Sequence, residues 1–127
     1  CVVDGLTTEG LAELDLTGEP RLDADVFPAG ANVEILTPLA AAASDGIDFH
    51  VDMRVYERGV GETRSCGTGL VAAATAALRK AGRAEGVVGL TVPGGDVVVT
   101  VAEGEAVLRG PSRLVARGQL VEGWADS

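Results

Sequence analysis

The sequence predicts an α+β domain in which a curved, mixed and mainly antiparallel sheet wraps around one buried central helix. Residues 67–80 form the one long helix-forming stretch, and they are apolar on every face, so this helix must be buried. Short apolar segments separated by tight turns follow it, which is typical of a β-meander. The length of 127 residues suits one domain with its own core.

The first third of the chain has no room for a long regular element. Glycines and prolines interrupt it at short intervals, so we expect only short strands or a brief helical turn. The apolar start Cys1–Val3 is strand-like, and Val33–Leu36 is predicted to be a strand.

The segment 47–57 alternates apolar and polar residues almost throughout, with the period of a half-buried strand. This strand ends at Glu57 and Arg58, so it places two charged side chains together at its end.

The predicted helix ends at Arg79 and Lys80, whose positive charges complement the helix dipole, and Gly82 follows as a stop signal. After the helix, turns such as Pro93–Asp96 separate further strands. These strands are expected at residues 87–92, 97–101, 106–109 and 113–121, and the tail 124–127 is expected to be a frayed end.

Composition excludes several classes of function. The net charge of −9 argues against nucleic acid or an anionic membrane surface as a partner. No apolar run approaches the roughly 20 residues that span a bilayer. The two cysteines lack metal-site spacing, so we expect no metal site and no disulfide framework, and a reduced, cytoplasmic setting. His50 lies on a strand face and receives no role.

The segment 57–69 has the sequence ERGVGETRSCGTG and ends where the helix begins. Cys66 directly precedes the first turn, whose unpaired N–H groups and partial positive charge favour a thiolate. Gly67 and Gly69 allow a ligand to approach these N–H groups, and Thr68 adds a hydroxyl. The turn therefore combines a candidate reactive thiol with a candidate carboxylate site.

Simpler interpretations exist for each of these residues. A single cysteine is most often a small buried hydrophobe. Glu57 and Arg58 form an ordinary exposed ion pair in many strand ends. Asn32, close after Gly30, has the composition of a turn. Position within the motif favours the functional interpretation of Cys66, Glu57 and Arg58, whereas that of Asn32 depends on the family resemblance described next.

The ordered motif closely resembles diaminopimelate epimerase, a cofactor-independent amino-acid racemase. The resemblance extends upstream through DVFPAGANVE at 25–34 and downstream through TVPGG at 91–95. It implies two similar domains with the active site in the cleft between them. Residues 1–127 would be the C-terminal domain, without the N-terminal domain and without the first strands of its own sheet.

In that family two cysteines, one from each domain, face the substrate's α-carbon from opposite sides. One thiolate removes the α-proton and the other thiol returns a proton, interconverting LL- and meso-diaminopimelate in lysine and peptidoglycan precursor biosynthesis. By position, Cys66 matches the C-terminal-domain cysteine. Glu57 is the implied residue that tunes its proton affinity, and no cofactor is implied.

The resemblance also implies the substrate-binding residues. Asn32 would hydrogen-bond the diaminopimelate, and Glu57 and Arg58 would bind its polar groups. The N–H groups of Gly67 and Thr68 would hold the α-carboxylate.

The second cysteine and its histidine partner belong to the half that is absent here, so we expect the 127-residue chain to be inactive alone. The partner it needs is the missing N-terminal domain, and an exposed sheet edge makes a homodimer a further expectation. Two alternatives stay open. The first is another isomerase substrate, because proline-racemase-type enzymes also use two thiols. The second is a non-catalytic carboxylate-binding or thiol redox-sensing domain, in which Cys1 would be the resolving thiol.

Overall fold

The computed structural model describes residues 1–44, 46–122 and 124. Its main sheet follows the order β1-β2-β4-β6-β7-β8, and β3 and β5 each pair with β4 outside that path. The strands are β1 (Val2–Asp4), β2 (Val33–Leu36), β3 (Ala40–Ala41), β4 (Phe49–Glu57), β5 (Gly61–Thr63), β6 (Gly86–Val92), β7 (Gly95–Ala102) and β8 (Glu105–Arg109). The helices are α1 (Thr8–Glu13) and α2 (Gly67–Lys80).

The sheet is mixed and mainly antiparallel, as the sequence predicts. The pairs β1–β2 and β4–β6 are parallel, and every other strand pair in the described part of the chain is antiparallel. In the β2–β4 pair Val33 lies opposite Tyr56. This register brings the beginning of β2 beside the end of β4.

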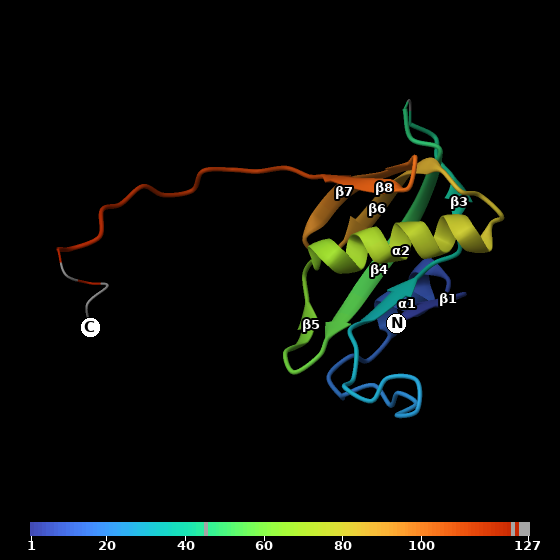
Figure 1. Ribbon diagram of the computed structural model, residues 1–127, viewed down its shortest axis with the longest axis horizontal. Coiled ribbons are helices and arrows are strands. Elements are labelled where there is room, and N and C mark those ends of the chain that lie inside the picture. Colours follow the sequence, from blue (N-terminus) through green and yellow to red (C-terminus); the bar gives the residue numbers. More distant parts are fainter. Residues whose placement is uncertain (45, 123, 125–127) are drawn as a thin grey trace.

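Helix α2 lies along the concave face of the sheet, and the edge strands β1 and β8 both contact it (Figure 1). The predicted bounds of this helix are confirmed. Its inner face forms the core with the sheet, and the fully buried members include Leu36, Met53, Leu70, Leu78 and Leu90.

The prediction that α2 is buried on every face is wrong in part. Ala72 is exposed, and Val71, Thr75 and Ala76 are partly exposed. The reason is the sheet order: β1 and β8 are the two edges, and the described residues supply no strand between them. One strip of the helix therefore stays open.

Helix α1 packs on the other side of the sheet, against β4. The side chain of Thr7 accepts a hydrogen bond from the Gly10 N–H and caps the start of the helix. Leu11 and Leu16 pack there against Val33 and Ile35 in a second apolar cluster. The sheet is thus covered on both faces near β2.

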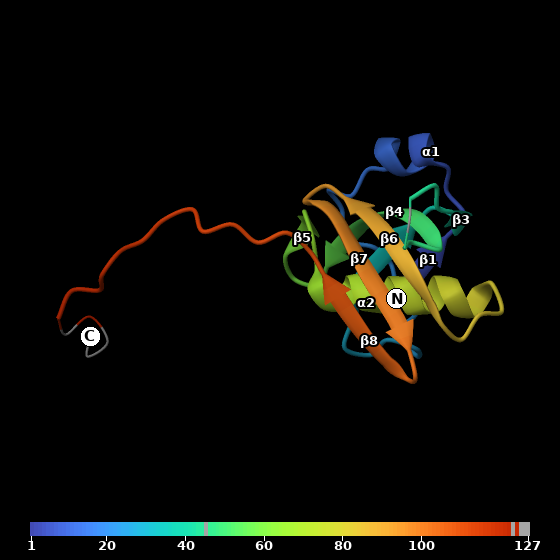
Figure 2. The same ribbon diagram turned by 90° about the horizontal axis from the view of Figure 1, so that it is seen from above.

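The strand predicted at 113–121 is wrong. Residues 110–121 have no regular secondary structure and extend away from the domain (Figures 1 and 2). A strand needs a neighbour for its backbone groups, and no described strand pairs with this segment. Of the frayed end predicted at 124–127, residues 125–127 lie outside the described residues.

Within the described residues, no helix combines the length and apolar character that crossing a bilayer requires.

Candidate active site

The beginning of β2 and the end of β4 bring Asn32 beside Arg58. The backbone N–H of Arg58 donates to Oδ1 of Asn32 at 3.0 Å. This bond fixes the orientation of the amide, because Oδ1 must face the N–H donor. The Asn32 Nδ2 then donates to Cys66 Sγ at 3.8 Å. Asn32 therefore links the end of β4 to the thiol.

Cys66 occupies the N-cap position of α2, as the sequence predicts. Its φ of −133° and ψ of 110° are extended, and the Leu70 N–H donates to its carbonyl at 2.9 Å to begin the helix. The N–H groups of Gly67, Thr68 and Gly69 have no partner within the helix, and the other described residues supply none. They form a row of donors directly after the thiol.

The sulfur also has a hydroxyl neighbour, because Thr68 Oγ1 lies 3.7 Å from Cys66 Sγ. An amide N–H and a hydroxyl that donate to sulfur both stabilise the thiolate form. Cys66 is only 9% exposed and also belongs to the core of the domain. Cys66 is therefore packed as a small buried hydrophobe, as the simpler interpretation expects. Its sulfur nevertheless has two polar neighbours, Asn32 and Thr68.

Glu57 lies at the end of β4 but does not contact the thiol. Its Oε1 accepts a hydrogen bond from Thr63 Oγ1 at 2.5 Å, across the β4–β5 hairpin. No contact between Glu57 and Cys66 is present among the described residues. No direct contact therefore supports the predicted influence of Glu57 on the proton affinity of Cys66 in the described part of the chain.

Arg58 lies along the loop before β2. Its guanidinium donates to the Ala29 carbonyl at 2.5 Å. Gly30 has a φ of +69°, and a Cβ there would come within 3.0 Å of the Arg58 side chain. The loop and Arg58 thus fit closely, and in this part of the chain Arg58 does not form an ion pair with Glu57.

Glu62, a further member of the motif, has a structural partner. Arg54 donates to both of its carboxylate oxygens, at 2.7 and 2.9 Å. This hydrogen bonding lowers the pKa of Glu62 below its ordinary value of 4.5. The same pairing raises the pKa of Arg54. The pair joins β4 to β5 and so stabilises the β4–β5 hairpin.

Sequence reasoning missed one residue of this region, Glu34 in β2. It is 3% exposed, and its Oε1 lies 2.7 Å from the position that a Cβ of Gly69 would occupy. Cys66 Sγ lies 3.3 Å from the same position. The signal was available in the sequence, since Glu34 interrupts an otherwise apolar strand.

His50 lies away from this region, on β4. Its Nε2 is 3.2 Å from Asp52 Oδ1, and its side chain is 43% exposed. The described residues contain no group of three His, Cys, Asp or Glu side chains that is placed to hold a metal ion.

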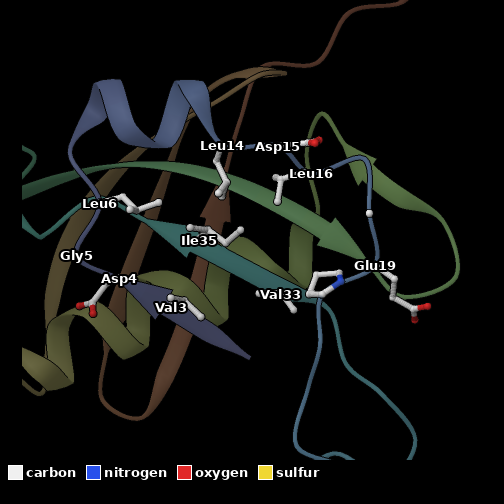
Figure 3. A pocket seen from close by; sticks show the side chains of 12 residues that line it. Val3, Asp4, Gly5, Leu6, Leu14, Asp15, Leu16, Glu19, Val33 and Ile35 are labelled. Carbon is white, nitrogen blue, oxygen red and sulfur yellow. The ribbon is translucent and has the colours of Figure 1, made fainter.

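A hollow of about 620 Å³ lies between the segments on either side of α1, residues 5–6 and 14–20, and the outer face of β1 and β2 (Figure 3). Its walls are mainly apolar, formed by Leu6, Leu14, Leu16 and Ile35 among others. None of the predicted site residues lines it. Cys66 and the donors of α2 are on the other side of the sheet, so this hollow is separate from the thiol site.

The family model and the similar proteins found by comparison all name the same family. The diaminopimelate epimerase family model matches residues 1–115. Diaminopimelate epimerase of Rhodococcus jostii is 57% identical over 124 residues, which is 98% of this chain and 40% of that protein. The Mycobacterium tuberculosis H37Ra protein of the same name is 55% identical over the same share of each chain. The Rhodococcus erythropolis protein of that name is 54% identical over all of this chain and 41% of its own length. The chain thus spans about two fifths of the length of these relatives, and it belongs to the diaminopimelate epimerase family.

Proposed function

We propose that this chain is the C-terminal domain of a diaminopimelate epimerase and that Cys66 is one of its two catalytic thiols. The observation that supports this most directly is the arrangement at the start of α2. The sulfur lies 3.8 Å from the Asn32 amide nitrogen and 3.7 Å from the Thr68 hydroxyl, and unpartnered N–H groups follow in the next turn. A base and an anion site thus share one turn.

The proposed chemistry is a proton transfer on each side of the α-carbon. The Cys66 thiolate takes the α-proton, so a C–H bond breaks and an S–H bond forms. The electron pair stays on the α-carbon and spreads into the carboxylate. A thiol on the opposite face then gives its proton to that carbon and becomes a thiolate. The reverse direction exchanges the two roles, and the configuration inverts in either case.

The donors at the start of α2 have a specific part in this step. The α-proton of an amino acid is weakly acidic, and no electron sink is proposed here. Negative charge that grows on the carboxylate needs fixed donors within the site. The N–H groups of Gly67 and Thr68 are the proposed donors, and the helix dipole adds to their effect.

Asn32, Glu57 and Arg58 are the proposed contacts for the rest of the substrate. Asn32 has a second function in this proposal, since its amide nitrogen donates to the Cys66 sulfur. Glu57 and Arg58 are adjacent at the end of β4 and offer opposite charges. A substrate with two ammonium and two carboxylate groups needs both kinds of partner.

The second thiol is proposed to come from an N-terminal domain outside these 127 residues. The exposed tail supports a further partner surface, because several large apolar side chains there have no cover. Leu114, Val115, Leu120 and Val121 are 69–88% exposed. Two exposed apolar pairs so close in the sequence support an interaction surface. We propose that the complete enzyme acts in the cytoplasm, in lysine and peptidoglycan precursor biosynthesis.

The test measures deuterium incorporation into LL-diaminopimelate in deuterium oxide. We expect no exchange with inversion of configuration by this chain alone, and exchange with inversion when the separately expressed N-terminal half is added. Cys66→Ser should abolish exchange in the mixture, and Cys1→Ser, the matched control at the other cysteine, should leave it within about twofold.

Exchange with inversion of configuration by the purified chain alone would contradict the proposed need for a second thiol. No exchange in a folded mixture would contradict the epimerase assignment. In that case, oxidation that joins Cys1 to Cys66 would favour a redox sensor, and binding of substrate without exchange would favour a carboxylate-binding domain.

A further inference from the structure

Glu34 carries a carboxylate at a buried position of β2, where an apolar side chain would be expected. Its neighbours in β2, Val33 and Ile35, line the hollow on the outer face of the sheet, beside the segment that follows α1 (Figure 3). Successive residues of a strand face opposite sides. Glu34 therefore faces the concave side, as does Leu36, which packs in the core against α2. Glu34 is one of two buried polar side chains in the described part of the chain, and it is 3% exposed.

The Glu34 carboxylate and the Cys66 thiol both lie at the first turn of α2. The position that a Gly69 Cβ would occupy is 2.7 Å from Glu34 Oε1 and 3.3 Å from Cys66 Sγ. The two acidic groups thus flank one point in the first turn of α2. The absence of a side chain at position 69 is what allows the carboxylate to reach this place.

The burial of the Glu34 carboxylate is energetically unfavourable and therefore requires an explanation. A buried carboxylate costs stability unless it is paired, and an apolar residue at this position would avoid that cost. Its one described ion pair is with the amine of Cys1, whose nitrogen lies 3.5 Å from Oε2. In any polypeptide that continues before Cys1 this nitrogen is a peptide N–H without charge. The start of α2 offers only partial compensation through its dipole.

A carboxylate beside a thiol disfavours a second negative charge. Asn32 and Thr68 act in the opposite direction, because both can donate to the sulfur. An epimerase thiol must serve as base in one direction and as acid in the other, so neither form can dominate. We propose that Glu34 is a positioning residue of this site: its carboxylate opposes ionisation of Cys66 and keeps the sulfur able to return a proton. This inference rests on the proposed function.

The other charged groups near the thiol do not replace Glu34 in this role. On β4, Glu57 is hydrogen-bonded to Thr63, and the Arg58 guanidinium is bonded to the Ala29 carbonyl. Neither contacts the sulfur. The Cys1 amine contacts Glu34, so Glu34→Gln removes the carboxylate and leaves the amine. Loss of the negative charge, with the positive charge of the amine still present, then favours the thiolate.

The test follows alkylation of Cys66 by iodoacetamide between pH 6 and pH 10, with mass spectrometry of the Cys66 peptide to separate it from Cys1. Only the thiolate reacts. For Glu34→Gln we expect the pH of half-maximal rate to fall by about one unit, which is about tenfold faster alkylation at pH 7. The plateau rate at high pH should not change. A change in exposure would instead alter the plateau.

Three variants complete the design. Glu34→Asp keeps the charge and should retain the wild-type profile, whereas Glu34→Leu, which removes the charge at similar volume, should match Glu34→Gln. Glu13→Gln removes the same charge from the exposed face of α1 and should leave the profile unchanged. The inference is overturned if the uncharged variants keep the wild-type profile, if they only raise the plateau, or if Glu34→Asp behaves as they do. The assay needs neither substrate nor the N-terminal half, so failure of the epimerase assignment would be seen separately, in the deuterium exchange.

Discussion

Replacement of Arg54 by methionine tests how the β4–β5 hairpin and α1 are held to the sheet. Arg54 bonds both carboxylate oxygens of Glu62 at 2.7 and 2.9 Å. It also donates to the carbonyls of Leu11 and Leu14, each at 2.7 Å. One side chain thus joins the end of α1, the centre of β4 and the β5 strand of the motif. Methionine keeps a stem of similar length and removes all of these bonds.

The expected loss can be estimated from these contacts. The Glu62 side chain is 33% exposed, so solvent screening limits the ion pair to about 1 kcal/mol. The two short bonds from a charged donor to the Leu11 and Leu14 carbonyls are partly buried and add about 2 kcal/mol together. We therefore expect Arg54→Met to lower the free energy of unfolding by about 3 kcal/mol and Glu62→Gln to lower it by about 1 kcal/mol.

The pH dependence follows from the lowered pKa of Glu62. A depressed folded-state pKa adds stability above the ordinary value of 4.5, and this stability is lost as pH falls through the folded-state pKa. The difference between wild type and Glu62→Gln should therefore be complete at pH 7 and should narrow below pH 4.5. The raised pKa of Arg54 keeps that group charged throughout this range.

Urea denaturation followed by far-ultraviolet circular dichroism measures these differences. Lys80→Met is the matched control, because Lys80 also pairs with a carboxylate, Asp4 at 2.6 Å, but is 69% exposed. It should change stability by less than about 0.5 kcal/mol. If Arg54→Met costs no more than Lys80→Met, the anchoring role of Arg54 is wrong.

Three further changes test the packing of the domain by the same denaturation measurement. Leu70 in α2 is 1% exposed, so Leu70→Ala should lower the free energy of unfolding by about 3 kcal/mol. A decrease of less than about 1 kcal/mol would contradict its place in the core. Gly94→Ala should cost at least about 1 kcal/mol, because its Cβ would lie 2.9 Å from the Arg64 carbonyl oxygen, and a neutral result would mean that the turn can shift. Glu103→Asn should instead stabilise by about 0.5 kcal/mol, since Glu103 has a φ of +52° and Gly104 follows at +80°, a pair that suits Asn-Gly; a loss of stability would refute this.

The parts of the fold that depend on local pattern were predictable. Strand Val33–Leu36 and helix Gly67–Lys80 have the predicted bounds, because apolar period and end signals lie within each segment. The strand predicted at 113–121 was wrong for a non-local reason, since its sequence suits a strand but no described neighbour pairs with it. The exposed strip of α2 has the same origin, because burial of a helix depends on how far the sheet closes around it.

The site shows the same division. Cys66 at the helix start followed from sequence, because capping position is a local property. The contact between Asn32 and Cys66 depends on the β2–β4 register and on the packing of α2, which no spacing in the sequence reveals. Glu34 was missed because a charged residue in a short strand is normally assigned to the exposed face.

Inversion at a carbon atom explains why the proposed epimerase reaction needs a second thiol. The proton must leave one face of the α-carbon and return to the other. Cys66 lies at the start of α2 with Asn32 and Thr68 at 3.8 and 3.7 Å from its sulfur, so in the proposed reaction this sulfur would serve one face only. A proton taken and returned by the same sulfur would exchange with solvent without change of configuration. The deuterium measurement separates these events, because exchange with retained configuration requires one thiol, whereas exchange with inversion requires two.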